Sequence, residues 1–326
     1  MPAPNAKPSR LDPDMRRRLT AQLGRWSRAM LSGWQGRLLT LFFLLLSAVV
    51  IAGVLLGNRD TILNYDWQIR PIWLLFILGF FLVDLLVATW AWHLLVARLA
   101  GYRNFRRSAK ICWWANLARR IPTPVWYIAG RALMYEQVGV SKLTVSLLST
   151  LELIFFFLSG LATTLLTLPF WAIPAEMQSA LSGYWLLFPL LPLSALFVHP
   201  RLLERIWRRL RPDAALQPLA WRDTLPWLGY YVLTWVLGAC VLFSVMNLLT
   251  PVPLAAMPAV VGIWSLAGSI SLAGALTISV IGVREISLTL LLTLLLPAPI
   301  ALIVAILIRI VWLLGEMLSA LLSLRL

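Results

Sequence analysis

Long apolar stretches, separated by short polar or basic segments, dominate the pattern along this chain of 326 residues. Several of them approach the roughly 20 residues with which a helix crosses the hydrocarbon layer of a membrane. Strands of a membrane β-barrel would alternate apolar and polar residues, whereas a stretch such as Leu38–Leu56 is almost solidly apolar. The pattern therefore predicts apolar helices over residues 38–56, 71–96, 143–171, 184–198, 225–249, 258–281, 286–296 and 300–322.

The polar segments between these stretches differ in charge, and this difference predicts their side of the membrane, since cytoplasmic loops carry an excess of Lys and Arg. The basic segments are residues 1–37, 98–110 and 199–223, together with Arg325. The segments expected outside are residues 57–70, 172–182 and 250–257. The two sides alternate correctly if residues 111–138 enter the membrane and return to the same side. We therefore expect an all-α polytopic membrane protein with about eight spans, one re-entrant or broken-helix segment and both termini in the cytoplasm.

Composition supports a membrane-embedded domain, because 60% of the residues are hydrophobic and only 13% are charged. The net charge of +15 would suggest nucleic acid for a soluble protein. Basic loops account for it here, so nucleic acid is not an expected partner. We expect a basic cytoplasmic tail over residues 1–37 and a transmembrane domain over residues 38–326. The two Cys and two His have no metal-ligand spacing and no Gly-rich phosphate-binding loop occurs, so no cofactor is expected.

Two segments interrupt the apolar pattern, and the first covers residues 111–138. Pro122 and Pro124 exclude one continuous helix, because each removes an N–H donor and clashes with the preceding turn. Thr123 is a favourable N-cap, and Pro124 suits the first position of a helix. We therefore expect two half-helices, over about residues 109–120 and 124–138, with Gly139 ending the second.

The N-terminus of the second half-helix is a candidate anion site. Its free N–H groups carry about half a positive charge, and Arg119, Arg120 and Arg131 lie near it along the chain. Phosphate is an anion that such an arrangement binds well. A surface helix-turn-helix with arginines that reach toward water is the alternative interpretation. Trp126 suits both, as a pocket wall or as a membrane-interface aromatic.

The second interrupted segment covers residues 265–288. Small residues recur there every four positions, in the series Ser265, Ser269, Ala273, Thr277 and the series Ala267, Ser271, Ala275, Ser279. Such faces let another helix approach closely. Gly282 then interrupts the helix, and Arg284 and Glu285 stand between two apolar stretches. Charged residues in that position usually face the protein interior or a wet cavity, although a very short cytoplasmic loop would explain them equally well.

Other charged residues lie inside the predicted spans. Asp84 and Glu152 are functional candidates because charge within a membrane is costly. Arg309, three turns into the last span, is a candidate partner for either carboxylate. Glu136 and Glu316 lie nearer to helix ends and are expected at the membrane interface. Structural ion pairs are the alternative explanation for all of these residues.

The interrupted segments carry a family resemblance. Residues 116–126 (NLARRIPTPVW), followed by Gly130-Arg131 and Gly139-Val140-Ser141, resemble the first signature of the flippase-like membrane region of lysyl-phosphatidylglycerol synthases. Residues 282–285 (GVRE) resemble the second signature, and the order, the spacing and the Glu-bearing span after the first signature agree. The resemblance covers the chain from about residue 38 to its end. It implies a prokaryotic plasma (inner) membrane protein.

The chain also departs from the family pattern. Thr123 stands where the family commonly has Gly, and Ser279, Val280 and Ile281 stand where it commonly has Gly and Pro. The full synthases carry a soluble aminoacyl-transferase domain after the membrane region, for which this sequence leaves no room. The resemblance therefore implies the translocation half of such a protein without its synthetic half, with a separate lipid-modifying enzyme as an expected partner.

These features predict a lipid flippase that moves a phosphate-bearing lipid between leaflets through a wet cleft between the interrupted segments. We expect Arg119, Arg120, Arg131 and the half-helix N-terminus, with Thr123 and Trp126, to hold the phosphate, and Arg284 and Glu285 to form a facing gate. Asp84 and Glu152 would be charge partners or proton carriers. A non-transporting accessory protein that binds a lipid or a glycan-lipid enzyme in envelope biogenesis is the alternative. A membrane-embedded transferase is the weakest, because no catalytic motif is present, so we do not expect an enzyme.

Overall fold

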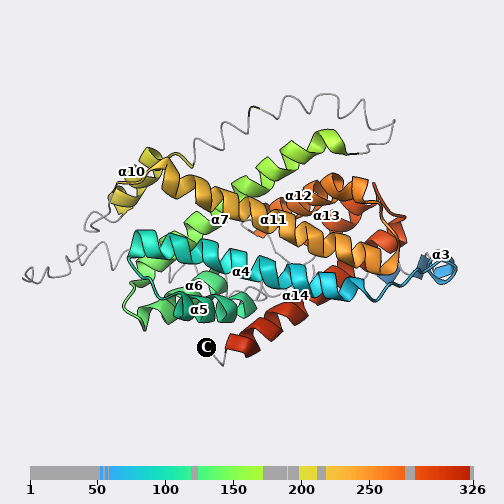
Figure 1. Cartoon of the computed structure of the whole chain (residues 1–326), viewed down its shortest axis with the longest axis horizontal. Coiled ribbons are helices and arrows are strands. Elements are labelled where there is room, and N and C mark those ends of the chain that lie inside the picture. Colours follow the sequence, from blue (N-terminus) through green and yellow to red (C-terminus); the bar gives the residue numbers. More distant parts are fainter. Residues whose placement is uncertain are drawn as a thin grey trace, which may run out of the picture.

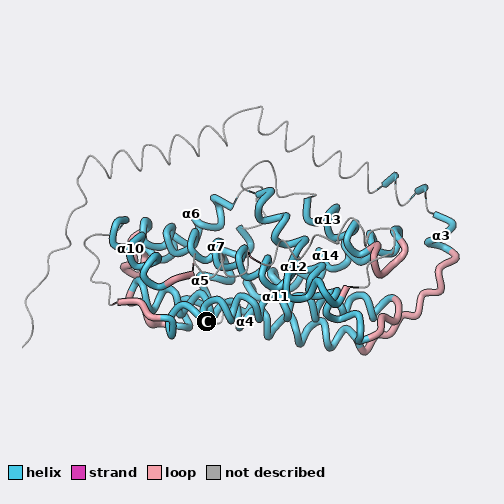
Figure 2. The backbone as a smooth tube through the Cα atoms, turned by 90° about the horizontal axis from the view of Figure 1, so that it is seen from above, coloured by secondary structure: helices cyan, strands magenta, loops and turns pink. Residues whose placement is uncertain are grey.

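The computed structural model describes residues 52–53, 56–57, 59–118, 124–171, 189, 198–210, 218–275 and 283–323. These residues are helical apart from turns and short connections, with no strand among them, which confirms the all-α class for the described part (Figure 2). The α-helices are α3 (Arg59–Leu63), α4 (Trp73–Ala100), α5 (Phe105–Ala118), α6 (Pro124–Glu136), α7 (Lys142–Thr167), α10 (Pro200–Leu210), α11 (Trp221–Leu249), α12 (Met257–Ala275), α13 (Val283–Leu292) and α14 (Ala298–Ser323). Two 3-10 turns, η1 (Leu168–Phe170) and η3 (Leu254–Ala256), extend α7 and precede α12.

Five of the described helices are long and apolar enough to cross a membrane, and all five coincide with predicted spans. They are α4, α7 with η1, α11, α12 with η3, and α14. The tail and the predicted span at 38–56 lie largely outside the described residues, as does the span at 184–198 apart from residues 189 and 198. The predicted stretch at 286–296 is not a complete span, because α13 has 10 residues. At 1.5 Å per residue it rises about 15 Å, half of the hydrocarbon thickness.

The central element is the antiparallel pair α4 and α11, which have the most extensive contact between described helices (Figure 1). At one end of the pair, Arg98 Nε donates to Asp223 Oδ1 at 3.0 Å. At the other end, the Arg70 amide donates to the Leu248 carbonyl at 3.0 Å. Two hydrophobic clusters lie along the pair, one nearer each end. Each interrupted segment therefore has its own core on a shared central pair.

The indole of Trp235 joins α11 to α7 and α12. Its Nε1 donates to the Phe156 carbonyl at 3.0 Å, and its ring lies between two glycines. A Cβ at Gly160 would lie 2.9 Å from this ring, and one at Gly268 would lie 2.4 Å from it. Ser269 lies against Gly160 and is 1% exposed, so the close approach predicted from the small residues is confirmed for the described part. The members of the two series outside the described residues are Thr277 and Ser279.

The first interrupted segment consists of α5 and α6, and the second of α12 and α13. α6 begins at Pro124, as predicted, and Gly139 has a φ of 86° in the turn that follows it. A positive φ is accessible to Gly without strain, which confirms its place at the end of this half-helix. α14 contacts both α13 and α5. This last helix therefore connects the second segment with the first.

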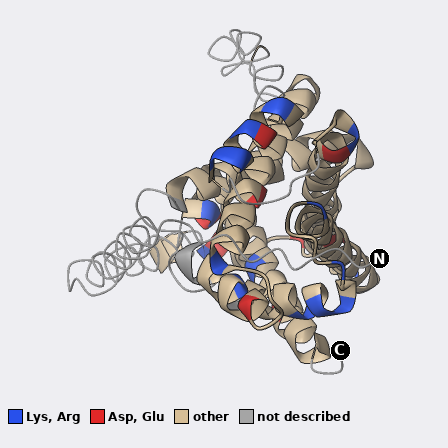
Figure 3. Cartoon of the chain, turned by 90° about the vertical axis from the view of Figure 1, so that its left-hand side faces the viewer, with Lys and Arg blue, Asp and Glu red and all other residues tan. Residues whose placement is uncertain are grey.

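Basic residues gather at the end of the bundle where α4 ends and α11 begins (Figure 3). We call this the basic end. α10 belongs to it and is amphipathic, with Leu203 and Trp207 buried one turn apart. Its exposed residues include four arginines, namely Arg201, Arg205, Arg208 and Arg209. The prediction that residues 199–223 form a strongly basic loop is thus refined, because part of this segment is a helix that packs on the bundle.

Glu204 gives α10 a pH-dependent attachment. Its carboxylate accepts from Arg208 Nε at 2.8 Å and from the Leu219 amide at 3.2 Å, and these bonds hold its pKa below the ordinary value. The stabilisation is therefore present at neutral pH and is lost as pH falls below 4.5, the ordinary pKa of this group. We expect a nitroxide attached through Arg205→Cys to gain mobility in this range in electron paramagnetic resonance. With Glu204→Gln the mobility should not change with pH, and equal pH dependence of both proteins would contradict the assignment.

Candidate functional site

A buried ion pair joins α6 to α7. Arg131 Nη1 donates to Glu152 Oε2, and the two side chains are 3% and 9% exposed. Tyr127, one turn before Arg131 on the same face of α6, donates from its hydroxyl to the same oxygen at 3.1 Å. Ser141 caps the start of α7, because its Oγ accepts from the Thr144 amide at 3.3 Å. This cap and the turn at residues 137–139 position Glu152 against α6.

Two aromatic rings enclose the guanidinium of Arg131. Its Cζ lies 3.9 Å from the ring centroid of Trp92 on α4 and 4.2 Å from that of Tyr127. Trp92 Nε1 donates to the Tyr135 hydroxyl at 2.8 Å, which fixes the orientation of the indole. Cation–π contacts of this kind are strongest where water is excluded. Arg131 is thus enclosed by two aromatic rings and a carboxylate and is only 3% exposed.

Some hydrogen-bonding atoms in and near this enclosure have no hydrogen-bond partner among the described residues. Arg131 Nη2 contacts Cys112 Sγ at 3.6 Å, whereas Arg131 Nε is buried without a hydrogen-bond partner among the described residues. The hydroxyl of Tyr231 on α11 is also buried and unpartnered there. A guanidinium has five N–H donors, and one carboxylate oxygen and one thiol do not satisfy them. Buried polar groups in proteins are nearly always satisfied, so these two atoms indicate room for a different or an additional acceptor.

A second ion pair joins α13 to α14. Arg309 Nη1 donates to Glu285 Oε1, and the side chains are 43% and 12% exposed. We had expected Arg309 to pair with Asp84 or Glu152. The structure pairs it with Glu285 because α13 turns back beside α14 and brings this carboxylate to it. Arg309 lies near the middle of α14, where a charge facing hydrocarbon would cost several kcal/mol.

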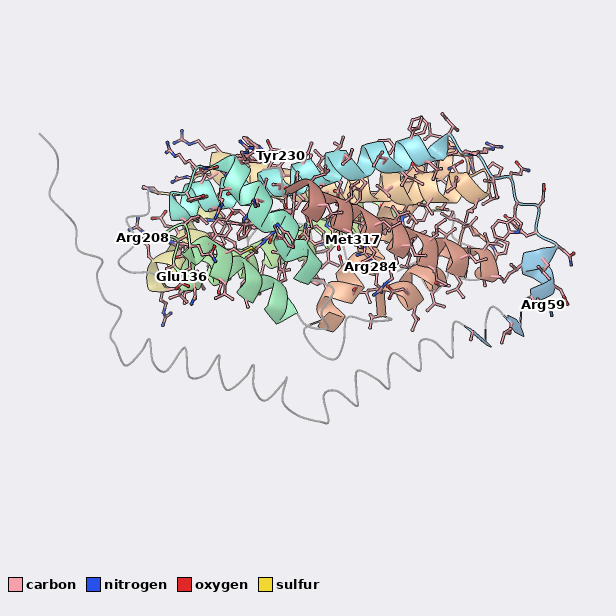
Figure 4. All side chains as sticks on the ribbon, turned by 90° about the horizontal axis from the view of Figure 1, so that it is seen from below. Arg59, Glu136, Arg208, Tyr230, Arg284 and Met317 are labelled. Carbon is pink, nitrogen blue, oxygen red and sulfur yellow. The ribbon has the colours of Figure 1, made fainter. Side chains whose placement is uncertain are left out.

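Arg284 belongs to the same centre. Its guanidinium lies 4.3 Å from the ring centroid of Trp264 on α12, and Trp264 stacks on Trp312 of α14 at 5.9 Å. Figure 4 shows Arg284 between Arg208 and Glu136 at one end of the bundle and Arg59 at the other. The first turn of α13 therefore carries a cation and an anion, each in contact with a neighbouring helix.

Helix α4 contacts the first centre at one position and an aromatic ring beside the second centre at another. Trp92 contacts Arg131, whereas Phe81 contacts Trp312 with ring centroids 5.1 Å apart. Phe81 and Trp92 each lie eight residues from an end of the 28-residue α4. They are eleven residues apart, which corresponds to about 16 Å along a helix. The α4 residue that contacts the first centre and the α4 residue that contacts Trp312 beside the second are thus equally far from opposite ends of α4.

The two centres are built alike with the charges exchanged. In the first, the half-helix α6 supplies the arginine and the following helix α7 supplies the glutamate. In the second, the half-helix α13 supplies the glutamate and the following helix α14 supplies the arginine.

The remaining residues singled out in the sequence lie in different environments, and some of them lie outside the described residues. Asp84 is buried in the middle of α4, at 6% exposure. Trp126 lies in the first turn of α6. Arg119, Arg120, Thr123 and Gly282 lie outside the described residues. Glu136 is exposed and pairs with Lys142 at 2.8 Å, as expected near an end. Glu316 is buried, and α14 continues for seven residues beyond it, so its interfacial position stays a prediction.

The chain matches no protein-family model, no curated protein and no solved structure. The resemblance to the flippase-like region therefore rests on the signature residues alone, and it enters the functional argument only as a proposal.

Sequence reasoning missed the residues that surround Arg131. Tyr127 could have been found, because it precedes Arg131 by one helical turn. Trp92, Cys112 and Tyr231 come from three other helices and carried no signal in the sequence. Only the packing of these helices against α6 brings them to the guanidinium.

Proposed function

We propose that this protein is a lipid translocase, in which the phosphate-bearing head group of a membrane lipid passes between the leaflets while its acyl chains remain in the hydrocarbon. The observation that supports it most directly is the presence of two arginine–glutamate ion pairs, one between α6 and α7 and one between α13 and α14. Charged residues inside membrane proteins usually mark an ion or substrate path. Two guanidinium positions on different helices would provide successive binding sites for one phosphate.

The chemistry of the residues suits a phosphate group. Arginine binds phosphate through two parallel N–H···O bonds, which gives both strength and orientation. Arg284 and the 43% exposed Arg309 would receive the head group first, because Arg131 is enclosed. Arg119, Arg120 and Thr123, which precede α6 in the sequence, would hold the phosphate before it reaches Arg131, together with Trp126 in the first turn of α6.

The proposal includes the finer topology. Residues 38–56 and 184–198 would supply further spans, for a total of about eight with the half-length α13, in a prokaryotic inner membrane. The basic end would face the cytoplasm together with both termini. The two centres of like construction and exchanged charge favour an inverted repeat, which is common in transporters with broken helices. The chain would then be a relative of the flippase-like region of lysyl-phosphatidylglycerol synthases.

This function implies partners rather than catalysis by the chain itself. The partners would be lipids with an anionic head group and a separate enzyme that modifies them, and nucleic acid would not be one. Because the sequence has no nucleotide-binding loop, the movement would be downhill or driven by a gradient.

Translocation in proteoliposomes tests the proposal. Fluorescent phospholipids and polyprenyl-phosphate lipids would be compared for the wild type, Arg284→Ala and the neutral double variant Arg131→Ala/Glu152→Ala. Loss of a charged hydrogen bond to phosphate costs about 1.5–3 kcal/mol, so each variant should move the preferred lipid about ten- to a hundredfold more slowly. Arg205→Ala, an exposed arginine of α10, is the matched control and should retain the wild-type rate. Equal rates for vesicles with and without the wild-type protein would contradict a translocase.

A non-transporting accessory protein is the second candidate. It is favoured by the fact that Arg131 and Arg309 each already have a glutamate partner, as structural ion pairs would. Such a protein would bind a lipid, or an enzyme that acts on a glycan-lipid, without moving it. Lipid binding by the wild type with no translocation of any lipid tested would select this function.

A further inference from the structure

The charge balance around Glu152 determines what can happen when a phosphate reaches Arg131. The titratable groups facing Glu152 are Arg131 and Tyr127 on α6 and Tyr231 on α11, with Tyr135 of α6 and Cys112 of α5 beyond the guanidinium. α4 contributes the indole of Trp92. Among the described residues around Glu152 only Arg131 is a cation, so these side chains together are neutral as long as Glu152 is ionised.

A monoanionic phosphate bound to Arg131 would upset this balance. The centre would then hold two anions and one cation at a site where both side chains are less than 10% exposed. A carboxylate that loses its cation in such a place is strongly disfavoured and takes up a proton instead. Neutrality is restored when Glu152 binds one proton for each phosphodiester that replaces it on Arg131.

The unused hydrogen-bonding atoms fit this exchange. Glu152 receives Arg131 and Tyr127 on a single oxygen, and Arg131 Nε has no hydrogen-bond partner in the part of the chain that the structure describes. The two free oxygens of a phosphodiester can accept from Nε and Nη together, which a guanidinium favours. The proton on Glu152 also needs an acceptor after the exchange, and the buried hydroxyl of Tyr231 on α11 has no hydrogen-bond partner among the described residues.

We propose that Arg131 exchanges Glu152 for the phosphate of a lipid head group, and that Glu152 is displaced as the neutral acid with one proton on its carboxyl. The inference rests on the proposed function and adds proton coupling to it. In the balanced step, the Arg131–Glu152 ion pair is broken, an Arg131–phosphate ion pair is formed, and one proton moves from solvent to Glu152. The reverse step releases the lipid and the proton together.

Calorimetry on the purified full-length protein in detergent measures this proton directly. Dihexanoyl phosphatidylglycerol, which carries one negative charge, is titrated at one pH into buffers with different enthalpies of ionisation, and inorganic phosphate is titrated in parallel. We expect uptake of about one proton per lipid, and affinity that falls about tenfold per pH unit while Glu152 is ionised in the free protein.

Substitutions at two glutamates of neighbouring helices distinguish proton uptake by Glu152 from a general effect of removing a negative charge. Glu152→Gln, which resembles the protonated side chain, should bind the lipid without proton uptake and without the pH dependence, whereas Glu152→Asp should restore both. Glu136→Gln, which removes the exposed partner of Lys142, should behave as the wild type. The wild-type measurement decides the inference by itself, so it does not depend on the recovery of a folded Glu152→Gln protein.

The outcomes distinguish this inference from the function on which it rests. Lipid binding by the wild type with no proton uptake would overturn proton coupling and leave translocation standing. No binding of the lipid would overturn the lipid site itself. Binding of inorganic phosphate with no binding of the lipid would overturn the assignment of the anion to a lipid head group.

Discussion

Glu152→Ala is expected to lower the free energy of unfolding by about 3–5 kcal/mol, because it leaves the Arg131 guanidinium buried without its counter-charge. The hydroxyl of Tyr127 loses its acceptor oxygen in the same substitution. Cation–π contacts with Trp92 and Tyr127 would offset only part of this cost. Unfolding of the purified protein in detergent, followed by thermal midpoint or denaturant titration, measures the change.

The double variant Arg131→Leu/Glu152→Leu is the matched comparison. It removes both charges and fills the site with apolar groups, so it should be more stable than Glu152→Ala although it contains more substitutions. Such non-additivity is typical of residues in direct contact. If the double variant were as unstable as the sum of Arg131→Leu and Glu152→Leu, the two residues would not be a coupled pair.

Gly268→Ala is expected to destabilise the bundle by about 1–3 kcal/mol through overpacking. A Cβ at this position would lie 2.4 Å from two atoms of the Trp235 ring. The ring cannot move aside freely, because its Nε1 donates to the Phe156 carbonyl at 3.0 Å and to Ser159 Oγ at 3.1 Å. The same unfolding measurement applies, and crosslinking between α11 and α12 should also become less efficient.

Gly229→Ala and Gly79→Ala are the controls for this substitution. Both positions are in long helices, and no atom lies within 4 Å of a Cβ placed there. Alanine is favoured over glycine in a helix by up to about 1 kcal/mol, so these variants should be as stable as the wild type or slightly more stable. A loss of stability in the controls equal to that of Gly268→Ala would show that the contact with Trp235 does not decide the effect.

The local features of the fold could be predicted from the sequence. Membrane-length helices follow from the apolar character of about 20 consecutive residues, and α4, α7, α11, α12 and α14 were all expected. The start of α6 at Pro124 and the turn at Gly139 follow from the backbone restrictions of proline and glycine. These properties depend on neighbours along the chain, so they do not require the tertiary structure.

The length of α13 marks the limit of this approach. Residues 286–296 read as an apolar stretch, yet the described helix ends at Leu292 and a turn follows it. Hydropathy reports that a stretch avoids water and does not distinguish a lipid-spanning helix from a short helix packed against α12 and α14. Whether the stretch forms a full span or a short helix therefore depends on its packing against neighbouring helices.

The sequence by itself determined which residues carry the charge inside the apolar helices, and Arg131, Glu152, Glu285 and Arg309 were all recognised in this way. Only the tertiary structure decided their partners. Arg131 meets Glu152 across 21 positions, and Arg309 meets Glu285 across 24. The attraction between two charges depends on their distance and on the exclusion of water around them. Both are set by which helix faces stand opposite one another, which the periodicity of a single helix does not specify.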